Sequence, residues 1–388
     1  MNFDNTEIAF AGKSNADLKR SYWLFTIIGW NWLIKISPML LKITLPLWIP
    51  IPIIKATIFK QFCGGESIKE CEKTINSLGK QRVKTILDYS VEGLKNEAVF
   101  DANVIEALEA IEKAKTNPNI PFSVFKPTGF GKFKILQKVN AKQKLTENEA
   151  AEYQRLVNRI DKICAAGAAA NVPLFIDAEE SWIQDAIDEI AVNMMRKYNK
   201  EKANIYNTAQ MYRWDRIAYL KELLTIANNE GFTIGVKLVR GAYIEKERAR
   251  AVKMGYEDPM QKTKENTDKD FNLALQICIE NITTVNFCCA SHNEESTLIL
   301  AQLMKDNNIN INDDRIYFAQ LLGMSDHISM NMSEGGYNIA KYVPYGPVKD
   351  VTPYLIRRAQ ENTSVAGQTG RELSLILTEQ KRRLKRKK

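Results

Sequence analysis

Short segments rich in β-branched and aromatic residues alternate with longer stretches of helical periodicity from about residue 86 onward. The ranges that we predict as strands are 86–90, 122–126, 173–177, 203–207, 233–239, 285–290, 315–320 and 340–344. Strands that alternate with helices predict a parallel sheet, and eight such units are the number that closes a (β/α)8 barrel. This α/β barrel is the predicted fold, and an open doubly wound sheet is the alternative.

Boundary signals support two of the predicted helices. Thr146 and Glu149 form a capping-box pattern before the stretch that runs to Ala170. Residues 214–229 place apolar side chains at helical spacing, and Gly231 follows them as a predicted C-cap. Because function in such barrels gathers at the carboxyl ends of the strands, the residues just after each predicted strand are the candidates for chemistry.

The N-terminal residues 21–59 are unusually apolar, although lysines interrupt them. Their longest charge-free runs, 21–34 and 43–54, are shorter than the roughly 18–20 apolar residues that a membrane-spanning helix needs. Tryptophan and lysine interleave with aliphatic residues, which is also typical of a segment that lies in a membrane interface. Packed helices, an interfacial segment and a true span remain three interpretations. The tryptophans concerned are Trp23, Trp30, Trp32 and Trp48.

The charge of the chain is concentrated at its end. The net charge over 388 residues is +8, and seven of the eight residues 381–388 are Lys or Arg. A solvated end and attraction to anionic lipid are the two interpretations, and without a nucleic-acid-binding module no nucleic-acid partner is expected. We divide the chain into an N-terminal helical segment (1–80), a barrel (81–375) and a basic tail (376–388).

Cysteine and histidine usage narrows the chemistry. Six cysteines occur without CxxC spacing, which indicates unpaired thiols in a reducing compartment. The two histidines, His292 and His327, are too few for a His-rich metal site. The chain lacks a complete GxGxxG after a strand, a GxxxxGK[ST] and a GxSxG, so a two-domain Rossmann flavoprotein, a P-loop enzyme and an α/β-hydrolase are not expected.

The segment 353–362 carries the first candidate chemistry. It follows the last predicted strand and reads as a helix in which Glu361 lies four residues after Arg357 and three after Arg358. Two adjacent guanidinium groups suit a carboxylate that is bound by bidentate hydrogen bonds. An exposed helix with Arg–Glu pairs is the alternative.

The segment 235–243 ends a predicted strand and brings Lys237 and Arg240 near the barrel mouth. Gly241 and Ala242 leave room for a ligand to approach the backbone. A positive charge here could face the reactive edge of a flavin and stabilise its reduced, anionic ring. Solvated bases at the end of a strand are the alternative.

The segment 175–180 ends another strand. Asp177 terminates an apolar run, so its carboxylate is expected to point into the barrel mouth. Lys126, at the end of a different strand, could pair with Asp177 or contribute to a carboxylate site. Glu179 and Glu180 are predicted to be loop charges.

Together these segments resemble the proline dehydrogenase family in its single-function form. The resembling ranges are 176–180, 236–243, 290–293, 320–324, 342–346 and 355–362. They occur in the order of the family, at predicted strand exits or on the final helix, and cover roughly residues 86–362. The chain is too short to hold the aldehyde dehydrogenase half of the fused, bifunctional form.

The resemblance implies an FAD enzyme that oxidises L-proline to Δ1-pyrroline-5-carboxylate by hydride transfer to the flavin. It implies that Lys126, Arg357 and Arg358 bind the carboxylate of proline and that Tyr342 closes over the pyrrolidine ring. Asp177 would help to arrange the site, and Lys237 would lie near flavin N5. The implied FAD contacts are Ala178, Gln210, Arg240, Gly241, Ala242, Ser291, His292 and Glu361.

The resemblance also implies a membrane quinone as electron acceptor, in agreement with peripheral membrane contact through residues 21–59 and the basic tail. Acidic residues precede the first arginine, unlike a mitochondrial presequence. We therefore expect a bacterial cytoplasmic enzyme at the inner membrane, or the mitochondrial inner membrane in a eukaryote. The alternatives are a hydroxyproline dehydrogenase, against which the bulk of Tyr342 argues, a non-enzymatic membrane-associated scaffold, and a phosphate-binding barrel lyase with Lys237 as Schiff base.

Overall fold

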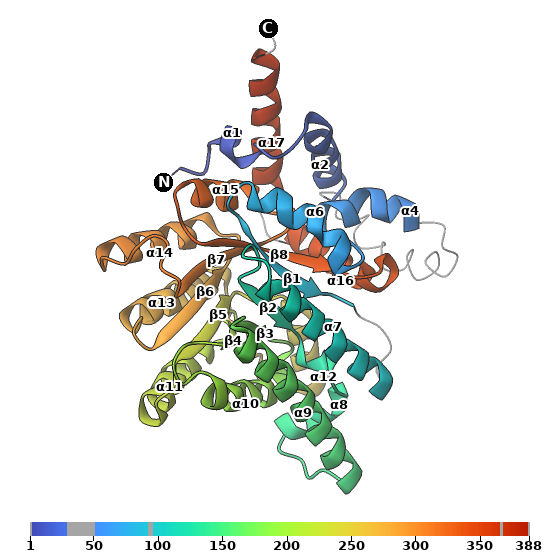
Figure 1. Cartoon of the computed structure of the whole chain (residues 1–388), viewed down its shortest axis with the longest axis vertical. Helices are drawn as coiled ribbons and strands as arrows, with labels where there is room; N and C mark the ends of the chain where they lie inside the picture. The colour runs from blue at the N-terminus through green and yellow to red at the C-terminus, as the bar shows by residue number, and fades with distance from the viewer. Residues whose placement is uncertain (1, 29–50, 92–95, 365–367, 387–388) are drawn as a thin grey trace. The chain divides into compact units, whose positions relative to one another are not determined.

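The computed structural model describes residues 2–28, 51–91, 96–364 and 368–386, without the side chains of 359–364, 368 and 369. Its strands form a closed parallel barrel in the order β1 to β8, and helices alternate with them along the chain (Figure 1). The predicted (β/α)8 fold is confirmed, and the open doubly wound sheet is wrong.

Each of the eight predicted strands occurs, with every boundary within three residues of the prediction. The largest difference is in β4, which continues through two polar residues. Asn207 Nδ2 donates to Asp188 and Tyr219 at 2.8 Å, and the Thr208 hydroxyl donates to the Ile176 carbonyl at 2.8 Å, so buried partners inside the fold bind both side chains. The strands are β1 (Lys84–Tyr89), β2 (Phe122–Phe125), β3 (Leu174–Ile176), β4 (Ile205–Gln210), β5 (Ile234–Val239), β6 (Val285–Ala290), β7 (Ile316–Leu321) and β8 (Ile339–Tyr345).

The chain divides into two compact units, which we call the central unit (residues 94–319) and the terminal unit (1–93 and 320–388). In the central unit, strands β2 to β7 pair in sequence, each parallel to the next. Helix α7 packs on β2, α10 and α11 on β4, and α13 on β5 and β6. The helices of this unit are α7 (Glu97–Lys115), α8 (Phe133–Asn140), α9 (Glu147–Ala170), α10 (Ser181–Tyr198), α11 (Arg216–Glu230), α12 (Ile244–Met254), α13 (Lys264–Glu280) and α14 (Glu294–Asp306), with the short 3-10 turn η3 (Pro127–Gly129).

The two predicted helix boundaries are confirmed. The Thr146 side chain accepts from the Glu149 N–H at 3.3 Å, and the Glu149 carboxylate accepts from the Thr146 N–H at 3.0 Å, so both ends of the capping box are formed. Helix α11 ends at Gly231, whose φ of +67° is the left-handed conformation that favours glycine at a helix C-terminus.

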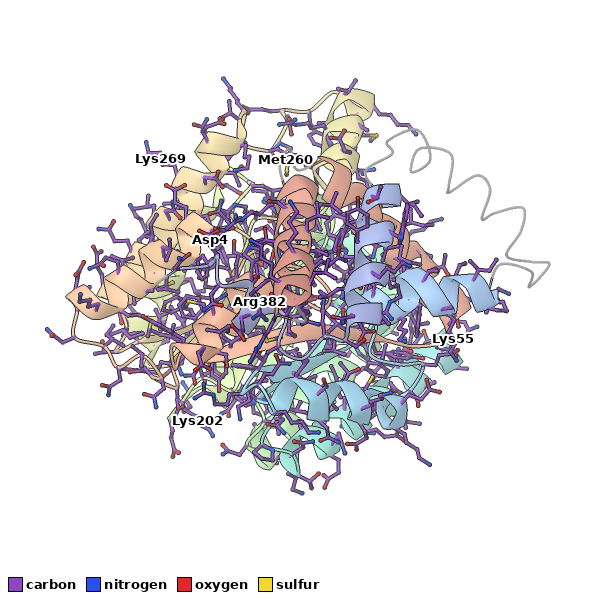
Figure 2. All side chains as sticks on the ribbon, turned by 90° about the horizontal axis from the view of Figure 1, so that it is seen from above. Asp4, Lys55, Lys202, Met260, Lys269 and Arg382 are labelled. Carbon is purple, nitrogen blue, oxygen red and sulfur yellow. The ribbon has the colours of Figure 1, made fainter. Side chains whose placement is uncertain are left out.

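In the terminal unit, β1 pairs with β8, α6 packs on β1, and α15 packs on β8. The last helix, α17, begins before the predicted tail boundary at 376 and continues to Lys385. Two of its basic residues are paired, since Arg382 and Arg383 lie 2.8 and 2.6 Å from Glu379 (Arg382 is labelled in Figure 2). The helices of this unit are α1 (Thr6–Ala9), α2 (Asn15–Ile28), α4 (Ile51–Ile54), the π-helix η2 (Lys55–Phe59), α5 (Lys60–Phe62), α6 (Ile68–Gly79), α15 (Asp326–Glu334), α16 (Val348–Ser364) and α17 (Gln368–Lys385).

The described part of the apolar N-terminal region is packed through some of its side chains. Phe25, Phe59 and Phe62 are buried in one cluster with Leu355 of α16 and Ile376 of α17. In the described part of the chain, no helix is both long enough and apolar enough to cross a bilayer. The predicted segment between residues 29 and 50, with Trp30, Trp32 and Trp48, lies outside the described residues.

All six cysteines are free thiols with buried side chains, as their spacing predicted. Cys63 and Cys71 belong to the terminal unit, whereas Cys164, Cys278, Cys288 and Cys289 belong to the central unit.

Candidate active site

The interior of the central unit begins with a layer of aromatic rings near the amino ends of the strands. The ring of Phe122 lies 4.4 Å from Phe175, 5.5 Å from Tyr206 and 4.8 Å from Tyr317, measured between centroids. Gly235 makes room for this layer, because a Cβ there would lie 2.6 Å from the Tyr206 ring. Side chains two and four residues further along the strands face the same side and lie above these rings.

Above the aromatic layer, the buried Asp177 and Lys237 and the half-buried Lys126 form a cluster that we call the lysine–aspartate cluster. The Lys237 ammonium group donates to Asp177 Oδ1, and the Lys126 Nζ lies 3.2 Å from Asp177 Oδ2. Lys237 Nζ is also 5.3 Å from the centroid of the Phe175 ring, a distance at which a cation is attracted by the ring face. The predicted pairing of Lys126 with Asp177 is therefore confirmed.

The charges of the cluster fix the state of its carboxylate. Burial alone would raise the pKa of Asp177, but attraction and hydrogen bonding from Lys237 and Lys126 outweigh it and hold the pKa below its usual value. Only 5% of the Lys237 side chain is exposed, compared with 31% for Lys126. Two lysines on one carboxylate make the cluster formally cationic, which suits an anionic substrate group.

Glu179 and Glu180 lie in the loop between β3 and α10, as predicted, but both side chains are buried. The Glu179 carboxylate accepts from the Thr128 N–H at 3.0 Å and the Thr128 hydroxyl at 2.5 Å. Burial nevertheless raises the pKa of Glu179 to about 7. Glu180 forms an ion pair with Lys246 of α12. Partners that are distant in sequence therefore stabilise both carboxylates inside the fold.

Gln210, at the end of β4, was predicted as a cofactor contact. Its Nε2 donates to the Glu179 carbonyl at 3.0 Å. Its buried Oε1 has no hydrogen-bond partner among the described residues. A buried acceptor of this kind is costly unless a ligand or water satisfies it, so Gln210 is available to a ligand.

The side chain of Arg240, just after β5, is held by hydrogen bonds and by an aromatic ring. Its guanidinium group donates to Asp268 at 2.7 Å, Ser291 at 2.7 Å and Ser296 at 2.9 Å, and lies 4.3 Å from the centroid of the Phe271 ring. The structure thus brings together two predicted cofactor contacts, Arg240 and Ser291, at the ends of β5 and β6.

The residues that follow Arg240 and Ser291 lie at the same strand ends. Gly241 has a φ of +130°, and a Cβ there would lie 2.5 Å from the Tyr212 ring, so only glycine fits. Gly241 and Ala242 are exposed, His292 is half-buried, and Ala178 is buried after β3. The backbone at the end of β5 is therefore open to an approaching group.

The remaining predicted residues belong to the terminal unit. Tyr342 lies in β8 with a buried side chain, and its carbonyl accepts from the Leu322 N–H at 2.8 Å. Arg357 and Arg358 lie on α16, where Arg358 is buried with its guanidinium carbon 4.9 Å from the Tyr354 ring centroid. The side chain of Glu361 lies outside the described residues.

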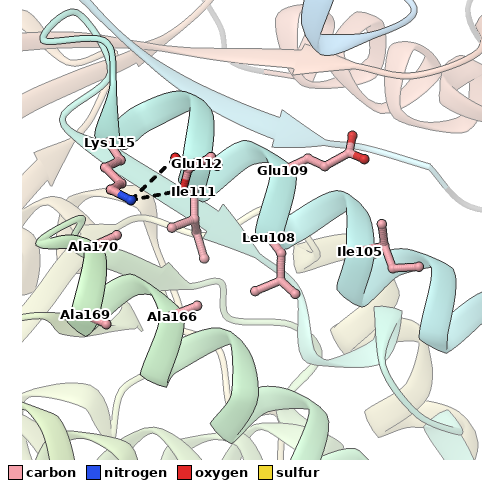
Figure 3. Close-up of a pocket in the computed structure, with 9 residues that line it drawn as sticks. All are labelled: Ile105, Leu108, Glu109, Ile111, Glu112, Lys115, Ala166, Ala169 and Ala170. Carbon is pink, nitrogen blue, oxygen red and sulfur yellow. Dashed lines mark hydrogen bonds and ion pairs between the residues drawn. The ribbon is translucent and has the colours of Figure 1, made fainter.

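A groove on the surface of the central unit is not a candidate active site. The groove has a volume of about 480 Å³ and lies between α7 and α9. Figure 3 shows its lining, which consists largely of the alkyl groups of Ile105, Leu108, Ile111 and Ala166. None of its lining residues is a predicted site residue. Across the described residues, no group of three or more His, Cys, Asp or Glu side chains could hold a metal ion.

A closed parallel barrel with ionisable side chains at the carboxyl ends of its strands defines the class of (β/α)8-barrel enzymes. Within that class, the chain belongs to the proline dehydrogenase family, whose model matches residues 71–371. It is thus an oxidoreductase of proline catabolism, as the resemblance in its sequence implied.

Comparisons with individual relatives and with solved structures agree with this family assignment. The chain is 33% identical to "Proline dehydrogenase 1, mitochondrial" of Dictyostelium discoideum, over 98% of this chain and 75% of that protein. It is 29% identical to "Hydroxyproline dehydrogenase" of Xenopus laevis, over 97% and 89%. Among solved structures, proline utilization A (PutA) from Bdellovibrio bacteriovorus shares the fold with a TM-score of 0.71 at 22% identity. That match covers 80% of this chain and 33% of the PutA chain, so the chain spans about a third of the PutA length.

Proposed function

We propose that the protein binds FAD, oxidises L-proline to Δ1-pyrroline-5-carboxylate and passes the electrons to a membrane quinone. The observation that carries the proposal is the lysine–aspartate cluster at the ends of β2, β3 and β5. It provides a fixed positive charge near the carboxyl ends of the strands, and the relatives of this family are named for proline, an amino acid with a carboxylate.

Binding of proline is assigned to side chains that recognise its carboxylate. Arg357 and Arg358 would each offer a planar fork of N–H donors, which matches a carboxylate in a bidentate way. Lys126 would add a point charge, and its contact with Asp177 limits the positions that its ammonium group adopts. Tyr342 would cover the ring of the substrate and exclude water from it.

The residues at the strand ends fit the chemistry of FAD. The buried Oε1 of Gln210 lacks a partner among the described residues and would accept a hydrogen bond from the cofactor. The exposed backbone at Gly241 and Ala242 would permit close approach, and Lys237 would place positive charge beside the ring. Bound FAD would supply the group that accepts hydride from the substrate. The residues proposed to hold it are Ala178, Gln210, Arg240, Gly241, Ala242, Ser291, His292 and Glu361.

Contact with a membrane would give access to quinone. The helices α2 and α4 expose large apolar side chains, namely Trp23 (55%), Ile27 (39%) and Ile53 (67%). The end of α17 and the last residues of the chain are basic, and both features favour an anionic lipid surface. We propose peripheral attachment to the cytoplasmic face of a bacterial inner membrane, or to the mitochondrial inner membrane in a eukaryote.

An absorption spectrum tests the central proposal. The purified protein, supplied with FAD, should show flavin bands that bleach when L-proline is added without oxygen and return when a soluble quinone is added. A protein that takes up no FAD would refute the cofactor assignment, and a flavoprotein that proline does not bleach would refute the substrate.

Hydroxyproline is the second candidate substrate, because one relative bears the name of a hydroxyproline dehydrogenase. The buried Tyr342 argues against it, since a phenol over the ring would crowd a ring hydroxyl group. Comparison of kcat/KM for the two amino acids decides between them, and we expect proline to be preferred.

A further inference from the structure

Thr128 and Glu179 form a second connection between the ends of β2 and β3. Both side chains are buried, and the carboxylate of Glu179 receives the N–H of Thr128 at Oε1 and its hydroxyl at Oε2, at 3.0 and 2.5 Å. Above a pH of about 7, the pKa of Glu179, its side chain is a carboxylate, and hydrogen bonds to a carboxylate are stronger than neutral ones, so this pair holds the two segments firmly.

The pair lies in register with the lysine–aspartate cluster. Thr128 follows Lys126 by two residues, and Glu179 follows Asp177 by two, so both side-chain pairs join residues that are 51 apart in sequence. The backbone continues the same register, because the Asp177 N–H donates to the Phe125 carbonyl at 2.9 Å. The contact of Lys126 with Asp177 therefore lies between two further connections of the same two segments.

The main chain of Glu179 is held from two further elements. Its N–H donates to Gln184 Oε1 on α10 at 2.8 Å, and its carbonyl accepts from Gln210 on β4 at 3.0 Å. Gln184 is in turn fixed by Asp188, which accepts from its Nε2 at 2.7 Å. Glu179 thus contacts the segment that carries Lys126 and the side chain proposed to meet the cofactor.

We propose that Glu179 is a positioning residue of the proline dehydrogenase reaction, which acts through Thr128 on Lys126. By fixing the turn after β2, the Thr128–Glu179 pair sets where the Lys126 ammonium group meets the carboxylate of proline. The inference rests on the proposed role of Lys126, and it predicts an effect on the KM for proline rather than on folding alone.

The chain contains a matched pair for comparison. Glu247 of α12 accepts from the Ser181 N–H at 2.7 Å and from the Ser181 hydroxyl at 2.6 Å. The chemistry equals that of Glu179 with Thr128, and Glu247 is also buried. This pair joins α10 to α12 and leaves the segment of Lys126 untouched, so Ser181→Ala controls for the loss of a buried hydroxyl–carboxylate bond.

The first experiment compares Thr128→Val, Thr128→Ser and Ser181→Ala in the FAD-loaded enzyme. Thr128→Val keeps the shape but removes the hydroxyl, and we expect a rise of about tenfold in KM for proline with kcat within about twofold, the scale of one lost charge-assisted hydrogen bond. Thr128→Ser restores the hydroxyl and should keep KM near the wild-type value. Ser181→Ala should lower the unfolding midpoint without raising KM.

A double-mutant cycle tests whether the effect passes through Lys126. Lys126→Met removes the ammonium group, so adding Thr128→Val to it should produce no further rise in KM. Glu179→Gln, which keeps the side-chain size, should raise KM in the wild-type background and not in Lys126→Met.

The outcomes separate the two proposals. If proline bleaches the wild type but Thr128→Val has the wild-type KM, or if its effect is equally large beside Lys126→Met, the positioning role of Glu179 is wrong while the function stands. If Lys126→Met itself leaves KM unchanged, the carboxylate site proposed above fails first, and the positioning role fails with it. If Thr128→Val does not fold, Glu179→Gln in the two backgrounds gives the same decision.

Discussion

Replacement of Asp177 by asparagine tests the electrostatics of the barrel interior. The substitution removes the negative charge that both Lys126 and Lys237 contact but preserves the size of the side chain. Lys126 is 31% exposed and can be solvated, whereas Lys237 is 5% exposed and would keep a buried charge beside the Phe175 ring. The cost should therefore come mainly from Lys237.

Loss of one partner of a buried ion pair costs about 3–5 kcal/mol, and the amide of asparagine can still accept a hydrogen bond, so we expect about 3 kcal/mol. For a protein of this size, that corresponds to a fall of about 4 °C in the unfolding midpoint. Adding Lys237→Met should recover most of the loss, because the pair is then replaced by an apolar side chain of similar length.

The pH dependence supplies a second check. The pKa of Asp177 is lowered in the folded protein, so its stabilising contribution is present above the unfolded value of 3.8 and lost as the pH falls through the folded value. The difference between wild type and Asp177→Asn should therefore stay constant from pH 5 upward and shrink only below about pH 4. Thermal and urea unfolding measure it. An unchanged midpoint for Asp177→Asn, or a double variant less stable than the single one, would refute the reasoning.

Three further predictions concern other parts of the chain. Burial raises the pKa of Glu179 from 4.5 to about 7, so the folded protein binds the proton of this carboxyl group more tightly than the unfolded chain does. The free energy of unfolding should therefore decline as the pH rises from about 4.5 to about 7. Glu179→Gln should remove up to about 3 kcal/mol of that decline in urea titrations, and equal slopes would contradict the assignment. Arg357→Met or Arg358→Met should raise KM for proline by about thirtyfold or more in steady-state assays, since a lost charge pair costs about 2–5 kcal/mol; wild-type kinetics in both would eliminate them from the site. Deletion of 381–388 should weaken binding to anionic vesicles at low salt but leave neutral vesicles unaffected, and equal binding by both chains would assign the basic end to solvent.

The barrel could be predicted from the sequence because its strands are short apolar runs between amphipathic helices. The limits of this pattern are seen in β4, which was predicted to end at Asn207 but continues through Thr208 to Gln210. A polar residue such as Thr208 is compatible with a buried strand only if a partner satisfies it, and that partner is the Ile176 carbonyl of the neighbouring strand β3. No local pattern contains that information.

The same limit applied to the site. Asp177 could be assigned because it follows an apolar strand, where a barrel directs its functional side chains. Glu179 and Glu180 were predicted as loop charges, and their burial could not be predicted because it depends on Thr128 and Lys246, 51 and 66 residues away. The one local signal was Thr128, which follows Lys126 and Pro127 and could bind a carboxylate. Which carboxylate it binds depends on the register of β2 and β3.

The buried thiols can be used to detect local unfolding of the structure around them. The thiolate is the nucleophile that reacts with an alkylating reagent, and burial raises the pKa of Cys164, Cys278 and Cys288 far above the ordinary range. Alkylation should therefore proceed only when the surrounding structure opens, at a rate set by local or global unfolding. Cys63 and Cys71 lie in the terminal unit, and the other four cysteines lie in the central unit. Peptide mapping after pulsed alkylation would therefore measure the rate of local unfolding in each unit separately, without any introduced label.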